Sequence, residues 1–229
     1  MRKNILCVIA HPDDEAFGPS GTLALLSKKH NIHIVCVTDG ASDVRFHPMG
    51  EQLAAIRSKE LQQSAEIIGA KSVHFLGYKD GSLCNNLYHK IAQKIDDLCE
   101  SLNIRLLLTI EPRGISGHLD HVAVSMMTTF VYEKRLSIEA TWYYCITKEV
   151  RSSIPTYFIH FPDGYDRKDI DLVVDISPVL DQKIAAIKCH ASQTKDVDRI
   201  LSRMPNFPPE ECFLVRSRMD KSIATKGYL

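Results

Sequence analysis

Apolar runs occur at regular intervals along the first half of the chain, and each is followed by a stretch with helical periodicity. The apolar runs cover residues 4–10, 32–37, 72–76 and 104–110, and the helical stretches cover 22–29, 50–69, 87–102 and 118–132. Short apolar runs between polar residues are typical of buried strands, whereas apolar residues three and four positions apart indicate a helix with one buried face. This alternation predicts a Rossmann-like α/β fold, in which helices cover both faces of a mainly parallel sheet to give three layers.

The pattern becomes more strand-like from about residue 141. We expect extended structure at 141–146, 156–161 and 172–176, followed by a helix over 178–190 with Ser177 as its cap. The tail from Ser202 onward contains three prolines and shows no periodicity. We interpret this half as a mixed-sheet extension, and we expect residues 1–229 to form a single domain, because this length suits one sizeable hydrophobic core.

Two polar clusters stand out against this background. His11-Pro12-Asp13-Asp14-Glu15 directly follows the first apolar run, and His118-Leu119-Asp120-His121 comes shortly after the fourth. The carboxyl ends of parallel strands share one edge of the sheet, which is where ligands bind in open α/β folds. Imidazole and carboxylate groups hold divalent metals, and a further carboxylate can act as a base. Either cluster alone would suit a charged helix start or a solvated surface, but together they predict a metal site.

The clusters resemble the two motifs of the PIG-L/LmbE-like family of metal-dependent N-acetylglucosaminyl de-N-acetylases. The first cluster, preceded by Ala10, matches the first motif, and His118 to His121 match the second, His-x-Asp-His. Weaker matches occur at Arg57-x-x-Glu60, at Asp80-Gly81 and at His190-Ala191-Ser192-Gln193. The resemblance therefore extends over nearly the whole chain. It implies an LmbE-like fold and a hydrolase that uses metal-bound water to remove an acetyl group from an N-acetylated amino sugar or sugar conjugate.

The resemblance also implies which residues hold the metal. The ligands would be His11, Asp14 and His121, and Glu15 is expected beside the site without ligating. Zn²⁺ is the expected cofactor, because it lowers the pKa of bound water towards about 7 and keeps one coordination position open. The same ligand set suits Fe²⁺ or another divalent metal, and the sequence leaves this choice open.

Three further residues are implied to take part in catalysis. Asp13 would be the general base that takes the proton of the attacking water. His118 would stabilise the oxyanion or protonate the leaving amine. Asp120 would orient His118 by accepting its other N–H.

Arg57 and Asp80 are implied to bind the substrate. The alternative for Arg57 is a salt bridge with Glu60 on the same helix face, and the alternative for Asp80 is a turn residue before Gly81. The sequence departs from the family after the second strand, where many members carry Gly-Glu and this chain has Gly40-Ala41-Ser42-Asp43. This difference concerns the substrate contacts and leaves the metal ligands unchanged.

Composition narrows the class of partner. Lys and Arg total 28, as do Asp and Glu, so no overall charge favours nucleic acid. No apolar segment approaches the roughly 20 residues of a membrane helix, so we expect no membrane anchor. The seven cysteines include no Cys-x-x-Cys pair, which favours free thiols and a cytoplasmic location. The expected partner is a small amino-sugar conjugate, and a homo-oligomer is compatible with the sequence.

Two alternatives belong to other functional classes. A receiver-like signalling domain would use Asp13-Asp14 and Thr147-Lys148, but it is far shorter and would leave both histidine clusters unexplained. A catalytically inactive sugar-binding relative would have lost the base or a metal ligand, whereas all four of those residues are present here.

Overall fold

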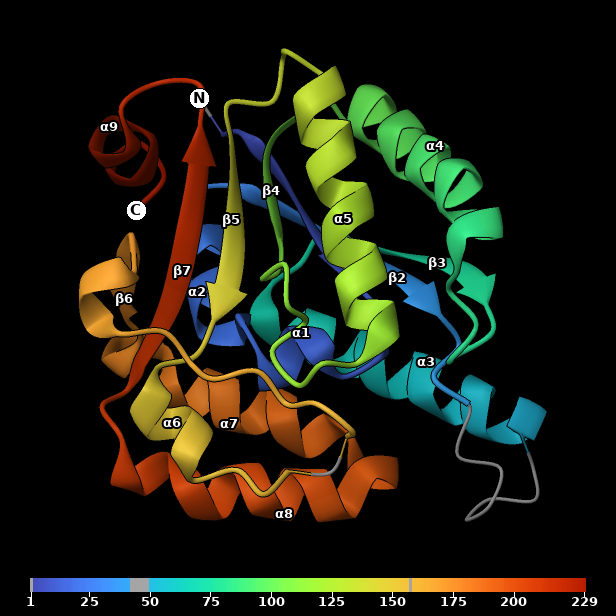
Figure 1. The fold of residues 1–229 in the computed structure, drawn as a ribbon, viewed down its shortest axis with the longest axis vertical. Helices are drawn as coiled ribbons and strands as arrows, with labels where there is room; N and C mark the ends of the chain where they lie inside the picture. Colours follow the sequence, from blue (N-terminus) through green and yellow to red (C-terminus); the bar gives the residue numbers. More distant parts are fainter. Residues whose placement is uncertain (1, 42–49, 157) are drawn as a thin grey trace.

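The computed structural model describes residues 2–41, 50–156 and 158–229, and its centre is a seven-stranded sheet in the order β3-β2-β1-β4-β5-β7-β6 (Figure 1). The first five strands are parallel, and β7 runs antiparallel to both of its neighbours. The strands are β1 Asn4–Ile9, β2 Asn31–Thr38, β3 Ser72–Tyr78, β4 Ile104–Ile110, β5 Ala140–Cys145, β6 Leu172–Asp175 and β7 Glu210–Ser217. This arrangement confirms the predicted mainly parallel α/β fold.

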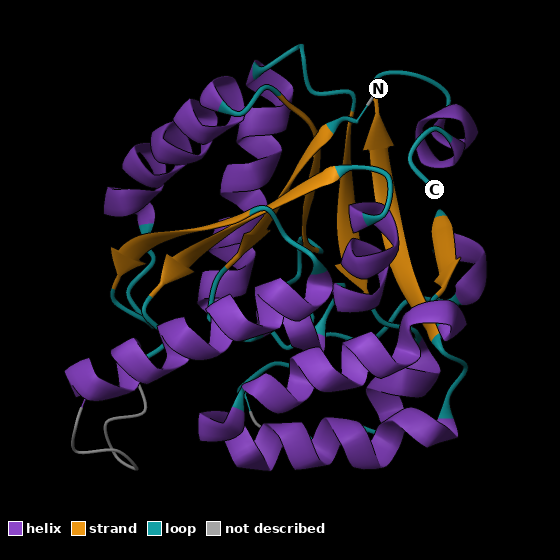
Figure 2. Cartoon of the chain, turned by 180° about the vertical axis from the view of Figure 1, so that it is seen from behind, coloured by secondary structure: helices purple, strands orange, loops and turns teal. Residues whose placement is uncertain are grey.

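Helices cover both faces of the sheet. The longer ones are α2 Ser20–Ser27, α3 Gly50–Ile68, α4 Asn85–Ser101, α5 Leu119–Lys134, α7 Leu180–Cys189 and α8 Thr194–Arg203. The short helices are α1 Asp14–Phe17, α6 Lys148–Ser152 and α9 Lys221–Lys226. Helices α4 and α5 lie on one face, whereas α2, α3 and α7 lie on the other, as the two opposite views show (Figures 1 and 2). The molecule therefore has the predicted three layers.

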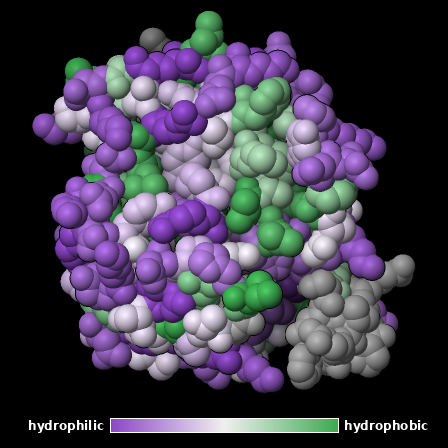
Figure 3. All heavy atoms as spheres, viewed as in Figure 1, coloured by the Kyte–Doolittle hydropathy of each residue, from purple (hydrophilic) through white to green (hydrophobic). Residues whose placement is uncertain are grey.

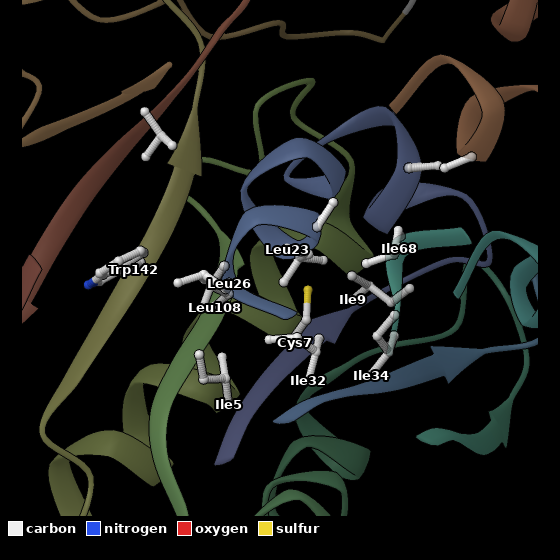
Figure 4. Close-up of a cluster of buried hydrophobic side chains, with 14 of the residues drawn as sticks. Ile5, Cys7, Ile9, Leu23, Leu26, Ile32, Ile34, Ile68, Leu108 and Trp142 are labelled. Atoms are coloured by element: carbon white, nitrogen blue, oxygen red, sulfur yellow. The ribbon is translucent and has the colours of Figure 1, made fainter. Parts of the chain in front are cut away.

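The alternating directions of side chains along β1 explain why both faces need cover. Ile5, Cys7 and Ile9 point into the core beneath α2 and α3, while Leu6 and Val8 point into the core beneath α4 and α5. Figure 4 shows the first of these cores, where Leu23 and Leu26 of α2 lie over β1 and its neighbours. Burying an aliphatic side chain of this size contributes about 1.5–3 kcal/mol. The apolar run that looked like a strand is thus the most buried part of the fold.

The C-terminal half agrees with the sequence less well. Strands β5 and β6 and helix α7 form where extended and helical structure were expected. The strand expected at 156–161 is wrong, because the described residues of that stretch lie in loops and bends. Ser177 begins a 3₁₀ turn over Ser177–Val179 and does not cap α7. Helix α8 and strand β7 were not predicted, although β7 is paired on both sides within the sheet.

The surface and the thiols bear on the expected partners. No helix in the described ranges is long and apolar enough to cross a membrane. The seven cysteines are free thiols. Leu119, Met126 and Phe130 expose apolar side chains along α5, where Figure 3 shows hydrophobic residues gathered on that helix. A homo-oligomer remains a prediction.

Candidate metal centre and active site

The order of the strands brings the two predicted clusters together. Strands β1 and β4 are neighbours, and the chain leaves β1 toward α2 and β4 toward α5, on opposite faces. Such a switch point leaves an opening at the carboxyl ends of the two strands, where ligands bind. His11 lies at the end of β1, and the loop after β4 leads to His118 and α5. Helix α1, which begins at Asp14, lies at this edge (Figure 1).

Ligand atoms of three residues converge at this edge. His11 Nδ1 lies 3.1 Å from His121 Nε2, and the same His121 nitrogen lies 3.2 Å from Asp14 Oδ1. One potential ligand atom from each of His11, Asp14 and His121 lies within 4.8 Å of the others. Two imidazole nitrogens and a carboxylate oxygen at such spacing are the donor set that Zn²⁺ and Fe²⁺ accept. The geometry therefore fits a divalent cation held by the three expected residues.

Each converging side chain is oriented by a hydrogen bond at its other end. Asp14 Oδ2 accepts the main-chain N–H groups of Ala10, at 3.1 Å, and His11, at 2.8 Å. His121 Nδ1 lies 3.1 Å from the Gly114 carbonyl, which selects the tautomer with a proton on Nδ1 and a free lone pair on Nε2. The far nitrogen of His11, Nε2, lies 3.0 Å from Asp80 Oδ1. These contacts leave His11 Nδ1 and His121 Nε2, the two nitrogens that face each other, available as ligands.

Asp80 was expected to contact the substrate, and the structure places it beside His11. It is buried, and Gly81 follows it with a positive φ of 73°, so the expected turn is also present. A carboxylate on the far nitrogen of a metal-binding histidine fixes the orientation of the ring and makes it a stronger ligand. Asp80 and His118 form a second possible metal group with His11, and Asp80 approaches His11 at Nε2, whereas His121 approaches it at Nδ1.

The electrostatics of the cluster favour a cation. Burial by itself would lower the pKa of His11, but hydrogen bonding to Asp120, Asp14 and Asp80 raises this pKa well above its ordinary value. Burial would raise the pKa of Asp14, but His121 and His11 hold it well below its usual range. The carboxylates of the cluster therefore stabilise positive charge, whether as a proton on His11 or as a metal ion.

Asp13 is paired with a cation from α3. Its Oδ2 accepts a hydrogen bond of 2.8 Å from Arg57 Nη2, and Arg57 Nη1 donates to the Gly40 carbonyl. Burial raises the pKa of Asp13, and the Arg57 charge opposes this rise. A Cβ atom on Gly40, whose φ is +65°, would lie 2.7 Å from the guanidinium carbon, so only glycine leaves room for this arrangement. Arg57 therefore contacts Asp13 and does not form the alternative pair with Glu60.

His118 lies beside the converging ligands, where its ring centroid is 4.5 Å from that of His11. The predicted contact between the Asp120 carboxylate and His118 is wrong. Instead the Asp120 main-chain N–H donates to His118 Nδ1 at 3.1 Å, while the carboxylate accepts the N–H groups of Gly81 and Leu83. Burial, followed by the nearby His11 and His121, lowers the pKa of His118 to about 4. His118 is thus a neutral ring with its proton on Nε2.

Other buried polar contacts beneath the site were not assigned from the sequence. His190 Nε2 lies 2.8 Å from Glu15 Oε1, and neither side chain has any exposure to solvent. Glu60 accepts two hydrogen bonds from Ser192. The late His190-Ala191-Ser192-Gln193 motif was the available signal, but its partners are distant in sequence.

Glu111, at the end of β4, organises the loop that carries the second cluster. Its carboxylate accepts the main-chain N–H groups of Arg113 and Ile115, at 2.9 Å each, and the Tyr165 hydroxyl at 2.7 Å. Gly114, whose carbonyl faces His121, lies between the two anchored residues. In the second loop of this edge, Ser42 and Asp43 of the departure from the family lie outside the described residues.

Comparisons with known proteins agree with this geometry. The model of the family described as PIG-L, GlcNAc-PI de-N-acetylase, matches residues 6–132. A probable N-acetyl-α-D-glucosaminyl L-malate deacetylase 2 of Bacillus cereus is 30% identical over 209 residues, covering 85% of this chain and 86% of the relative.

Solved structures show the same fold at lower identity. The A40926 pseudoaglycone deacetylase Dbv21 has a TM-score of 0.72 at 19% identity, covering 96% of this chain and 99% of its own. The 4-carboxy-2-hydroxymuconate hydratase GalB of Pseudomonas putida has a TM-score of 0.71 at 17% identity, covering 95% of this chain and 97% of its own. The fold alone therefore does not select the reaction. The family match, the full-length relative and the converging ligands show that the chain belongs to the PIG-L family of GlcNAc-PI de-N-acetylases.

Proposed function

We propose that this protein is a metal-dependent deacetylase that hydrolyses the acetamide of an N-acetylated amino sugar or sugar conjugate. The observation that carries the proposal is the convergence of His11 Nδ1, His121 Nε2 and Asp14 Oδ1 beside the buried Asp13. Amide hydrolysis requires an activated water and a stabilised oxyanion, and the described residues offer groups for both.

His11, Asp14 and His121 would hold the cation, with Zn²⁺ as the first candidate and Fe²⁺ as the second. When bound, such an ion lowers the pKa of water and polarises a carbonyl group. The protein itself supplies the orientation of the ligands, because Asp80 and the Gly114 carbonyl fix the two rings.

Asp13 is the proposed general base. It is adjacent in sequence to Asp14, yet its carboxylate contacts Arg57 and not the histidine ligands. Burial raises the pKa of Asp13, and the Arg57 charge opposes that rise by favouring the ionised carboxylate. A carboxylate in this balance can accept a proton from water and later release it.

His118 is proposed to face the developing negative charge of the substrate. Because its Nδ1 already accepts a hydrogen bond, its Nε2–H is the group available to donate to an oxyanion. Its low pKa, about 4, favours a neutral hydrogen-bond donor over a proton donor to the leaving amine. We therefore favour the first of the two roles expected from the resemblance.

The roles of three neighbouring residues are proposed as follows. Asp80 and Asp120 orient the site, the first through His11 and the second through the loop at Gly81 and Leu83. Arg57 orients Asp13 through their hydrogen bond. We also propose, as a second role, that Arg57 and Asp80 contact the substrate.

The proposed substrate class follows the names of the relatives. The Bacillus cereus relative carries the name of a deacetylase of N-acetylglucosaminyl malate. We propose a small N-acetylglucosamine conjugate as the substrate.

The test is acetate release from a panel of N-acetylglucosamine conjugates by the wild type and by Asp13→Ala, with bound metal measured on each protein. We expect the wild type to release acetate, and Asp13→Ala to retain metal while its rate falls by about 10²–10⁴-fold. Equal rates in the two proteins would contradict the base assignment. A metal-loaded wild type that binds these sugars without releasing acetate would favour the inactive sugar-binding relative.

A further inference from the structure

A closed ring of buried contacts lies directly beneath Asp13. One arm runs from Asp13 to Arg57 of α3, at 2.8 Å. One turn further along α3, Glu60 accepts the main-chain N–H of Ser192 at 2.7 Å and its hydroxyl at 2.6 Å. The other arm runs from His190 Nε2 to Glu15, at 2.8 Å, and Glu15 lies in α1, two residues after Asp13, which is the N-cap of that helix.

The segment that closes this ring comes from the far end of the chain. His190 ends α7, and Ser192 lies in the 3₁₀ turn over Ala191–Gln193 that leads into α8. Helix α7 packs beside α3 on one face of the sheet (Figure 2). The two contacts of this segment therefore connect both α1 and α3 to the turn between α7 and α8.

Because these groups are buried, each depends on its protein partners for hydrogen bonds. Glu15 and His190 are completely shielded from solvent, and Arg57 and Glu60 are only 6% and 7% exposed. A buried charged group that loses its partner cannot turn to water, so it must move or remain unsatisfied. Within the described residues, the second nitrogen of His190 has no hydrogen-bond partner, so the bond to Glu15 is its sole polar anchor.

We propose that His190 and Ser192 are positioning residues for the reaction, which act by holding Glu15 and Glu60 and thereby fix Asp13 and Arg57 beside the metal ligands. The predicted loss of kcat rests on the proposed function, because it requires the deacetylase reaction. Among the described residues, the His190 side chain contacts Glu15, and the Ser192 hydroxyl donates to Glu60 and accepts from Gln193, so neither side chain bonds to the proposed metal ligands. Loss of either contact is expected to lower kcat, while metal content and KM stay close to those of the wild type.

The size of the effect follows from geometry. A catalytic group displaced by about 1 Å loses about 10²-fold in rate, and loss of an orienting partner around a metal site costs about 10–100-fold. We therefore expect Ser192→Ala and His190→Leu each to lower kcat by about 10–100-fold. Ser192→Thr and His190→Gln retain a hydroxyl and an N–H donor, respectively, and each should recover most of the loss.

Matched control variants separate positioning from general stability. Ser58→Ala removes a hydroxyl on α3 whose partner, among the described residues, is the Ala54 carbonyl of the same helix. His30→Leu removes a buried histidine at the opposite edge of the sheet, where it contacts the Tyr228 carbonyl. Both should leave kcat unchanged, and the melting temperature of His30→Leu shows how far the loss of a histidine contact away from the site destabilises the fold.

The experiment combines steady-state kinetics, bound metal, melting temperature and crystal structures of the wild type, Ser192→Ala and His190→Leu. Support requires a fall in kcat at constant metal content, and an Asp13–Arg57 contact that is lengthened or lost in Ser192→Ala. An unchanged contact with unchanged kcat overturns the proposal, as does a loss of kcat in His30→Leu equal to that in His190→Leu. If the wild type releases no acetate, the proposed function fails, and the Asp13–Arg57 contact in the crystal structures alone decides the positioning role.

Discussion

The two edges of the sheet both hold acidic groups that are largely shielded from solvent, but the neighbours of these groups differ. At the amino edge, Glu139 accepts hydrogen bonds from Lys3, at 2.8 Å, from Arg105, at 3.2 Å, and from the Tyr228 hydroxyl, at 2.8 Å. At the carboxyl edge, Asp14 lies instead against His11 and His121, whose facing nitrogens approach each other to 3.1 Å. Two imidazole nitrogens at that distance can share one proton or one cation.

This difference distinguishes a cluster that could bind a metal from a cluster that only stabilises the fold. The Glu139 carboxylate is surrounded by permanent donors, so it holds the start of β5 to the N-terminal strand and to the C-terminal residues without further chemistry. The Asp14 cluster contains groups whose charge depends on what they bind, which is the property that a metal centre needs. To recognise a metal site in this fold, the kind of donor beside each carboxylate is therefore more informative than the number of charges.

The largest expected effect comes from removing one converging ligand. His121→Ala should abolish tight metal binding, because two ligands are too few for a stable site. Acetate release should fall by at least about 10³-fold, since the polarising effect of a metal is worth several kcal/mol. Elemental analysis and the acetate assay check both outcomes. The amino-edge variant Glu139→Gln is the control, and retention of a full equivalent of metal by His121→Ala would contradict the ligand assignment.

The second effect concerns the folded state with and without metal. Chelation should destabilise the wild type, because an ion that binds only the folded state stabilises it by about 2.7 kcal/mol at a concentration 100 times its Kd. The measurement is chemical unfolding with Zn²⁺ and with chelator. His121→Ala should show no such difference, whereas Glu139→Gln should show the full one. A metal effect of equal size in all three proteins would place the ion elsewhere.

The carboxyl edge was more predictable from sequence than the parts that support it. His11 and Asp14 follow an apolar strand directly, so a local pattern is enough to place them at the edge of the sheet. The strand β7 was missed because prolines precede it, and because Glu211 faces inward to meet the α2 N-terminus and Lys183, which breaks the expected alternation. Its position in the sheet depends on these long-range pairs, which no local pattern contains.

The same distinction applies within the site itself. The ligand set follows from two short motifs, but the contacts of Asp80 and Asp120 depend on how neighbouring loops approach each other. Asp120 was expected to accept a bond from His118, two residues away, and its carboxylate instead holds Gly81 and Leu83 from another loop. Buried acceptors take whichever donors the packed loops present, so these partners could not be chosen from sequence distance.

A third, smaller effect should appear at the amino edge alone. Glu139→Gln removes a partly buried charge that three donors share, and a hydrogen bond to a charged group contributes about 1.5–3 kcal/mol, with solvent reducing the contribution of the partly exposed Lys3 and Arg105. We expect the free energy of unfolding to fall by about 1.5 kcal/mol with kcat unchanged. Urea unfolding measures the change in the free energy of unfolding, and the acetate assay measures kcat. A fall in kcat with full metal content would show that the two edges are coupled, contrary to the comparison.

The smallest effect is a pH dependence of stability in a second structural cluster. Asp96 of α4 accepts hydrogen bonds from Arg135, at 2.5 Å, and Lys134, at 3.0 Å. Burial would raise the pKa of Asp96, but these bonds lower it below its usual value. A carboxyl whose folded pKa is depressed contributes stability that is present above its unfolded pKa of about 3.9 and is lost as the pH falls through the folded value.

Comparing the wild type with Asp96→Asn isolates this contribution. The stability difference between the two proteins should be constant from pH 5 to pH 7, at about 0.5–1.5 kcal/mol, the net contribution of a typical hydrogen bond, and it should shrink as the pH falls below about 4. Urea unfolding across that range is the measurement, with Asp97→Asn, its neighbour on α4, as the matched control. Neither cation of this cluster can lose its charge in this range, so the pH dependence comes from the carboxyl groups, which are Asp96 and also Glu100, the second partner of Arg135. A difference that persists undiminished at pH 3 would show that the charge of Asp96 does not stabilise the fold, and the contrast with the carboxyl edge would then rest on Glu139 alone.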